Sequence, residues 1–175
     1  PFNLAPTAST TASLVLGDAL AMAIMRARGF RERDFARRHP SGAIGRALLL
    51  RVADVMRREQ RNPVAPSSLT VKEALLVMTR AKSGSVAVTS PSGRLVGVFT
   101  DGDLRRRMAA GDDVLGMTLS RVMTRRPVCI REDALAVEAV RRFHERNIDD
   151  LIVVNARRHP VGIVDSQDLP RLKLL

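Results

Sequence analysis

Two stretches of the chain, EALLVMTRAKSGSVAVTSPSGRLVGVFTDGDL (73–104) and EAVRRFHERNIDDLIVVNARRHPVGIVDSQDL (138–169), align with each other without a gap. A shorter pair, VADVM (52–56) and LSRVM (119–123), precedes them in the same order. Identical aligned pairs include Glu73/Glu138, Ala74/Ala139, Val88/Val153, Gly97/Gly162, Asp103/Asp168 and Leu104/Leu169. Self-similarity at a fixed period indicates two copies of one supersecondary unit.

Each copy predicts the same order of elements. Apolar residues at helical spacing predict a helix, which Thr70 and Glu73 can cap in the first copy and Asp133 in the second. Two β-branched runs joined by a turn then predict a hairpin, and a short helix begins near Asp101 and again near Ser166. The predicted segments are strands 63–65 and 127–130, helices 70–82 and 133–146, and hairpin strands 86–89, 95–99, 151–154 and 161–164.

The predicted fold is therefore α/β (α+β), with β-α-β-β-α occurring twice in tandem. We expect a remnant of another domain at residues 1–47, the first copy at 48–115 and the second at 116–175. One copy alone buries too little surface to form a stable domain, so the two copies should bury their sheet faces against each other. Such a pair leaves clefts between its halves, where small ligands usually bind.

Composition narrows the function classes. The formal net charge is +11 and is almost all arginine, which favours anionic ligands, and the guanidinium fork suits phosphate. The arginines are scattered and stacking aromatics are scarce, so we expect no nucleic-acid partner; binding of nucleic acid through the arginines would show a steep salt dependence.

The longest apolar run, residues 13–25, contains Asp18 and is too short for a bilayer, so we expect no membrane partner. The single Cys129 indicates a reducing cytoplasm, and no metal-ligand spacing or cofactor motif is present.

The repeat resembles the CBS domain, and the pair resembles a Bateman module, over roughly residues 50–175, most specifically at GVFTDGDL (97–104). The resemblance implies a nucleotide-type ligand, with Asp103 on the ribose hydroxyls and Thr100 at a phosphate or the ribose. Arg105 and Arg106 add positive charge nearby. Asp168 keeps the ribose role in the second copy.

Two features of the sequence leave open whether the pair binds a ligand and which kind of ligand it binds. Asp165 stands where the pattern has Thr or Ser, and a carboxylate repels a phosphate, so the second site either fails or takes a less charged ligand. Thr100 and Asp103 are also ordinary helix-capping residues. The alternative to a ligand sensor is therefore a structural oligomerisation module that binds nothing.

The front segment, LAPTASTTASLVLGDALAMAIMRARGF (4–30), predicts an apolar helix over residues 12–28 that ends at Gly29. A helix that is apolar on nearly every side is buried in something larger, so we interpret residues 1–47 as the end of a truncated domain. Together with DFARRHPSGAIGR (34–46), it resembles the arabinose-5-phosphate isomerase family, in which a sugar isomerase (SIS) domain precedes two CBS domains.

That resemblance implies a parent enzyme that interconverts arabinose 5-phosphate and ribulose 5-phosphate for the synthesis of Kdo, a sugar of the bacterial outer envelope and its lipopolysaccharide. It makes His39 a candidate catalytic residue that reaches a neighbouring subunit's active site, although Ser41 departs from the family's usual glycine. Aldose–ketose isomerisation needs an acid–base group that titrates near neutrality, as histidine does. We expect this chain alone to be inactive, the CBS pair to sense an adenine nucleotide or a nucleotide-activated sugar, and the protein to form a dimer or tetramer.

Overall fold

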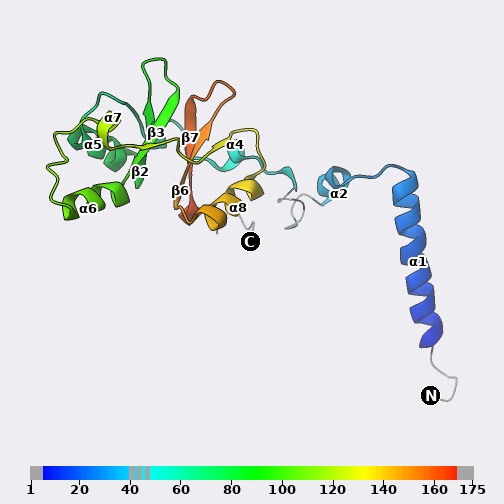
Figure 1. Cartoon of the computed structure of the whole chain (residues 1–175). Coiled ribbons are helices and arrows are strands. Elements are labelled where there is room, and N and C mark those ends of the chain that lie inside the picture. The colour runs from blue at the N-terminus through cyan, green and yellow to red at the C-terminus, as the bar shows by residue number, and fades with distance from the viewer. Residues whose placement is uncertain (1–5, 40–41, 43–44, 46–47, 169–175) are drawn as a thin grey trace.

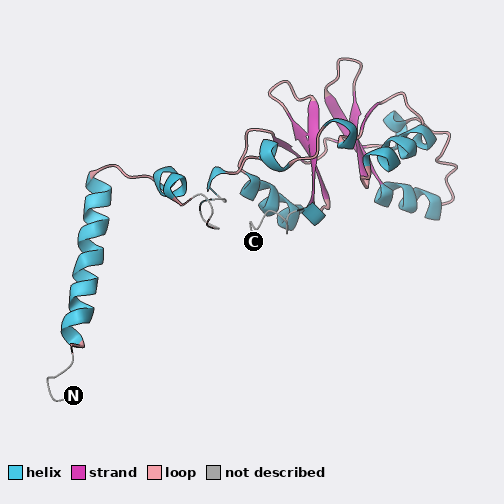
Figure 2. Cartoon of the chain, turned by 180° about the vertical axis from the view of Figure 1, so that it is seen from behind, coloured by secondary structure: helices cyan, strands magenta, loops and turns pink. Residues whose placement is uncertain are grey.

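The computed structural model describes residues 6–39, 42, 45 and 48–168, so Ser41 and the end of the chain lie outside the described residues. Figure 1 and Figure 2 show two parts. Helices α1 (Ala8–Ala27) and α2 (Glu32–Arg38) stand apart, and the sheets and remaining helices of the repeat lie together at the other end.

The first copy has the predicted order of elements. Its elements are β1 (Val64–Pro66), α5 (Val71–Ala81), β2 (Ser85–Thr89), β3 (Leu95–Thr100) and α6 (Asp101–Ala109), with a short 3-10 helix, η1 (Glu59–Arg61), before them. Strand β1 pairs with β2 in parallel and β3 pairs with β2 in antiparallel fashion. Because β2 is central, all five of its residues are buried.

The second copy repeats this arrangement. Its elements are β5 (Cys129–Arg131), α8 (Ala136–Arg146), β6 (Asp150–Val154) and β7 (Pro160–Asp165), and residues 166–168 form a 3-10 turn where α6 begins in the first copy. The pairing is again β5 with β6 in parallel and β6 with β7 in antiparallel fashion. The predicted β-α-β-β order is confirmed in both copies and the final helix in the first, whereas the described part of the second copy ends in the 3-10 turn.

The two copies exchange their leading segments. Helix α4 (Val52–Val55) and Met56 pack in the core of the second copy, against α8 and β6. Conversely, α7 (Leu119–Val122) packs in the core of the first copy, and β4 (Thr124–Arg125) pairs with β3 as the fourth strand of that sheet. Each core is therefore completed by residues that precede the other copy in sequence.

A third apolar cluster joins the sheets. Ala87 and Leu95 of the first copy contact Ile152, Val154 and Ile163 of the second. All five side chains are at most 5% exposed, so this seam excludes water. The expectation that the two sheet faces cover each other is met here, and the burial of aliphatic surface holds the pair as one unit.

The predicted capping of the first helix of each copy holds in only one copy. Thr70 and Glu73 form the capping box of α5: the Thr70 amide donates to the Glu73 carboxylate at 2.9 Å, and the Glu73 amide donates to the Thr70 hydroxyl at 3.4 Å. The prediction that Asp133 caps the second helix is wrong. Helix α8 begins at Ala136, and Asp133 instead pairs with Arg131 at 2.8 Å.

Helix α1 begins earlier than predicted and ends at Ala27, and Gly29, two residues further on, adopts the left-handed φ of +62° that glycine allows at low cost. None of its residues is buried in the described part of the chain. Its 20 residues, a longer stretch than the apolar run considered above, are apolar enough to cross a membrane by length and composition alone. Core helices of soluble proteins and signal sequences share that property, so it assigns no location.

Candidate functional site

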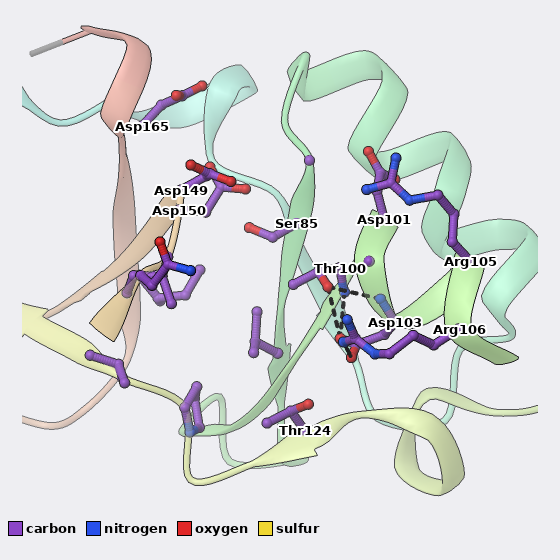
Figure 3. Close-up of a pocket in the computed structure, with 18 of the residues that line it drawn as sticks. Ser85, Thr100, Asp101, Asp103, Arg105, Arg106, Thr124, Asp149, Asp150 and Asp165 are labelled. Atoms are coloured by element: carbon purple, nitrogen blue, oxygen red, sulfur yellow. Dashed lines mark hydrogen bonds and ion pairs between the residues drawn. The ribbon is translucent and has the colours of Figure 1, made fainter. Parts of the chain in front are cut away.

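A cavity of about 600 Å³ lies between the two copies, on the side of the repeat where α6 begins. Its walls come from the start of α6, the ends of β2 and β3, residues 124–128 that lead into the second copy, and residues 147–150 before and at the start of β6. Of the predicted ligand-binding residues, the structure brings Thr100, Asp103, Arg105 and Arg106 together around it (Figure 3).

Thr100 and Asp103 form a closed set of hydrogen bonds. The Asp103 amide donates to the Thr100 hydroxyl at 3.1 Å, and that hydroxyl donates to Asp103 Oδ2 at 2.9 Å. Arg106 binds Asp103 Oδ1 at 2.6 Å from an exposed position. Thr100 and Asp103 therefore cap the N-terminus of α6, as their residue types predict. The Thr100 amide also donates to Asp103 Oδ2, at 3.0 Å. Because a carboxylate has about four acceptor positions, Asp103 keeps capacity for about one further donor.

The wall opposite Arg106 is acidic. Figure 3 shows Asp149, Asp150 and Asp165 across the cavity from Asp103 and Arg106. Burial raises the pKa of Asp150 to about 6, and the charge of Asp165 adds to this effect, while the Ser85 hydroxyl and Arg57 oppose it. The cavity thus has a cationic side and an anionic side, which disfavours ligands with several phosphates on the anionic side.

Ser85 is a site residue that the sequence analysis missed. It lines the cavity, is 0% exposed, and its hydroxyl acts on the neighbouring Asp150 carboxylate, whose pKa it lowers. Next to it, Gly84 leaves room for carboxylates, since a Cβ there would lie 3.4 Å from Asp150 Oδ2 and 3.6 Å from Asp101 Oδ2. The aligned positions in the second copy are Asp149 and Asp150, a mismatch in the repeat that could have drawn attention to Gly84 and Ser85.

Asp168, the predicted ligand-binding residue of the second copy, does not line this cavity. Its Oδ2 accepts from Arg57 Nε at 2.7 Å. Arg57 also binds Asp165 Oδ2, the residue in place of the expected Thr or Ser, at 2.8 Å. The second copy therefore uses both carboxylates in an internal ion-pair network.

His39 lies outside the cavity, just after α2. Its amide donates to the Phe35 carbonyl at 3.0 Å, and its exposed imidazole lies 4.8 Å from the Phe35 ring, centroid to centroid. Within the described ranges no cluster of three or more His, Cys, Asp and Glu that could hold a metal ion occurs. The structure therefore places His39 beside Phe35, away from the cavity.

The family model of the CBS domain matches this chain twice, at residues 52–110 and 119–173. The chain belongs to the CBS domain family. Its two CBS copies are those defined by the repeat, and the cavity lies between them. The predicted tandem CBS fold is thereby confirmed.

Curated relatives extend the similarity to the front segment. The chain is 47% identical over 171 residues to the arabinose 5-phosphate isomerase KdsD of Pseudomonas aeruginosa and 43% identical to the KdsD of Escherichia coli K12. Each alignment covers 98% of this chain and 52% of the relative. The chain therefore spans about half the length of the curated relatives it matches.

Solved CBS pairs share the fold. The CBS domain pair of protein MJ0100, in complex with 5'-methylthioadenosine and S-adenosyl-L-methionine, superposes with a TM-score of 0.62 and 26% identity, covering 70% of this chain and 94% of that one. CBSX2 in complex with AMP gives a TM-score of 0.60 and 26% identity, covering 71% and 96%. Both ligand sets contain adenosine.

Proposed function

We propose that this chain is the regulatory part of an aldose–ketose isomerase acting on arabinose 5-phosphate and ribulose 5-phosphate, and that its CBS pair senses an adenine nucleotide or a nucleotide-activated sugar. The cavity of about 600 Å³ between the CBS copies carries the proposal. Its size suits a drug-sized ligand. The relatives named KdsD support the parent activity, and the adenosine-containing complexes support the ligand class.

The cationic side of the cavity offers a place for one phosphate. Gly102 in the first turn of α6 lines the cavity, as do Arg105, Arg106 and Arg126. A helix N-terminus and guanidinium groups together stabilise an anion. The remaining acceptor position of Asp103 suits one hydroxyl of a ribose, and a second hydroxyl would bind there if it displaced the exposed Arg106 from Oδ1.

The anionic side restricts the ligand. Asp149 and Asp150 would repel a second and third phosphate, whereas they can accept hydrogen bonds from sugar hydroxyls or an amine. A monophosphate or a nucleotide-activated sugar fits this charge distribution better than ATP does. Feedback by a late product of the pathway would require that the ligand bind two states of the enzyme with different affinities.

His39 belongs to the parent's isomerase half in this proposal. Its imidazole would act as an acid–base group at a neighbouring subunit's site in a dimer or tetramer. The chain alone should show no isomerisation when it is mixed with arabinose 5-phosphate. The single Cys129 is free among the described residues, and a cytoplasmic location agrees with that.

A structural oligomerisation module is the second candidate. The hydrogen bonds between Thr100 and Asp103 favour it, because they give both residues a purely structural use. The α1 helix, apolar and exposed, would in either case be covered by the parent's isomerase half or another copy.

Calorimetry separates the two candidates. We would titrate the chain with AMP, ATP, a nucleotide-activated Kdo and arabinose 5-phosphate, and repeat the titration with Asp103→Ala. Asp112→Ala is the matched control, since that carboxylate binds Arg107 beyond the other end of α6 and outside the cavity. Saturable binding that is lost only in Asp103→Ala supports the sensor. No heat with any ligand supports the scaffold.

A further inference from the structure

The two CBS copies place different residues at one equivalent position, Arg57 in one and Thr124 in the other. Each residue directly follows the short repeated segments VADVM (52–56) and LSRVM (119–123). Thr124 pairs with Val98 on β3, and Arg57 pairs with Ile163 on β7. Val98 and Ile163 are aligned in the repeat, so the backbone places Arg57 and Thr124 at matching edges of the two sheets.

Arg57 extends over the residues that would form the second ligand site. Its Nε binds Asp168 Oδ2 at 2.7 Å, and its Nη2 binds Asp165 Oδ2 at 2.8 Å. Its Nη1 donates to the Lys82 carbonyl at 3.1 Å. All three guanidinium nitrogens therefore have a partner on the protein.

This network is largely removed from water. The side chains of Arg57, Asp165 and Asp168 are 10%, 14% and 22% exposed. Ion pairs at this depth are held firmly, because breaking one leaves an uncompensated charge in a poorly hydrated place. The hydrogen bond to Asp168 also raises the pKa of Arg57 above its usual range, so the guanidinium stays charged.

The first copy has a threonine, Thr124, at the position equivalent to Arg57. There Thr124, with a short side chain, lines the cavity beside Thr100 and Asp103. In the second copy both aligned positions are carboxylates, Asp165 and Asp168, and one guanidinium satisfies them. Asp165, which stands where the pattern has Thr or Ser, is thus matched by Arg57, which supplies its counter-charge.

We propose that the Arg57 guanidinium takes the place of an external ligand at Asp165 and Asp168, the two positions of the second copy that align with Thr100 and Asp103. Each chain then offers a single site, the first-copy cavity, to an external ligand. The count of external ligands rests on the proposed function. The role of Arg57 at Asp165 and Asp168 does not depend on it.

The first experiment needs no nucleotide. Arg57→Ala should unfold at a temperature lower by about 5 °C or more, because the ion pairs of Arg57 with Asp165 and Asp168 are lost. Millimolar methylguanidinium should raise the midpoint of this variant in a saturable manner and leave the wild type unchanged, relative to equal concentrations of tetramethylammonium. Arg58→Ala is the matched control: this neighbouring arginine donates to the Ala53 carbonyl from an exposed position. If Arg57→Ala behaves like Arg58→Ala and ignores methylguanidinium, the proposal is overturned.

The second experiment counts sites with AMP as the probe. The double variant Arg57→Thr with Asp165→Thr gives the second copy the residues of the first at both positions and leaves no unpaired arginine. Calorimetry should give one AMP per chain for the wild type and two for the double variant. Two AMP per wild-type chain would contradict the proposal. No AMP binding to the wild type would count against AMP as the ligand of the first cavity, while the methylguanidinium result would still decide the role of Arg57.

Discussion

Thr100 and Asp103 satisfy each other's polar groups at the point where β3 ends and α6 begins. The threonine hydroxyl accepts from the Asp103 amide and donates to the Asp103 carboxylate, which in turn accepts from the Thr100 amide at 3.0 Å. The same two residues face the cavity between the CBS copies. The capping of α6 and the proposed ligand binding therefore involve the same pair, and substitutions must be chosen to separate the two effects.

Thr100→Val should destabilise the chain by about 1 kcal/mol, because the helix loses its side-chain cap while the residue keeps its shape. Thr100→Ser keeps the hydroxyl and should remain within a few tenths of a kcal/mol of the wild type. Urea unfolding monitored by circular dichroism measures both. Equal stability of the two variants would mean that the cap contributes nothing in this setting.

Asp150 should make the chain less stable as pH rises towards neutrality. Its pKa is raised from 3.8 to about 6, mainly by burial, so between these values the folded state holds more protons than the unfolded chain. Asp150→Asn should therefore stabilise the chain at neutral pH by on the order of 2 kcal/mol, and the gain should vanish below the ordinary aspartate pKa. Thermal unfolding across pH tests this. The exposed Asp149→Asn is the control, and an equal gain there would refute the role of burial.

Gly162→Ala should be more destabilising than Gly97→Ala, although the two glycines are aligned. A Cβ at Gly162 would lie 2.6 Å from Met56 Sδ and also 2.8 Å from the Arg57 carbonyl oxygen, which is backbone, whereas the three atoms nearest to a Cβ at Gly97 all belong to the Met123 side chain. We expect losses of about 3 and about 1 kcal/mol. Adding Met123→Ala should offset part of the Gly97→Ala loss, and adding Met56→Ala should offset less of the Gly162→Ala loss, because the backbone contact remains. Equal rescue in the two double variants would show that the backbone contact is unimportant.

Replacing Leu16, Leu20 and Ile24 by serine should reduce self-association of the chain. These α1 side chains are 62%, 55% and 52% exposed and recur along one face of the helix. A continuous exposed apolar stripe favours pairing with another copy. Light scattering over a range of concentrations measures the association, and thermal unfolding should give an unchanged midpoint for the CBS pair. A lowered midpoint would show instead that α1 packs on the repeat.

The fold could be predicted because the same pattern of helices and strands occurs in both copies of the repeat. Where one copy is ambiguous, the other supplies the pattern, and the hairpin turns and the Thr70 cap are encoded within a few residues. The exchange of α4 and α7 between the cores was not predictable in this way. It depends on which copy a short apolar segment packs against, and adjacent cores of similar aliphatic composition offer such a segment equivalent surfaces.

The Thr100 and Asp103 side of the candidate site could be predicted because it is local in sequence. Thr100 and Asp103 belong to one local turn, so the sequence places them together. The acidic wall and Ser85 come from segments distant in sequence, and only the packing of the two sheets brings them to the cavity. The pairing of Asp168 with Arg57 spans 111 positions and has no local signal.

The exchanged segments also determine how this architecture can be divided. Since Val52 completes the core of the second copy and Leu119 completes that of the first, neither repeat is a self-sufficient module. A gene fragment that encodes one repeat yields a chain with an open core, whereas a chain cut between α6 and α7 yields two pieces that must assemble to fold. Gain or loss of this unit in other proteins has to involve the pair as a whole.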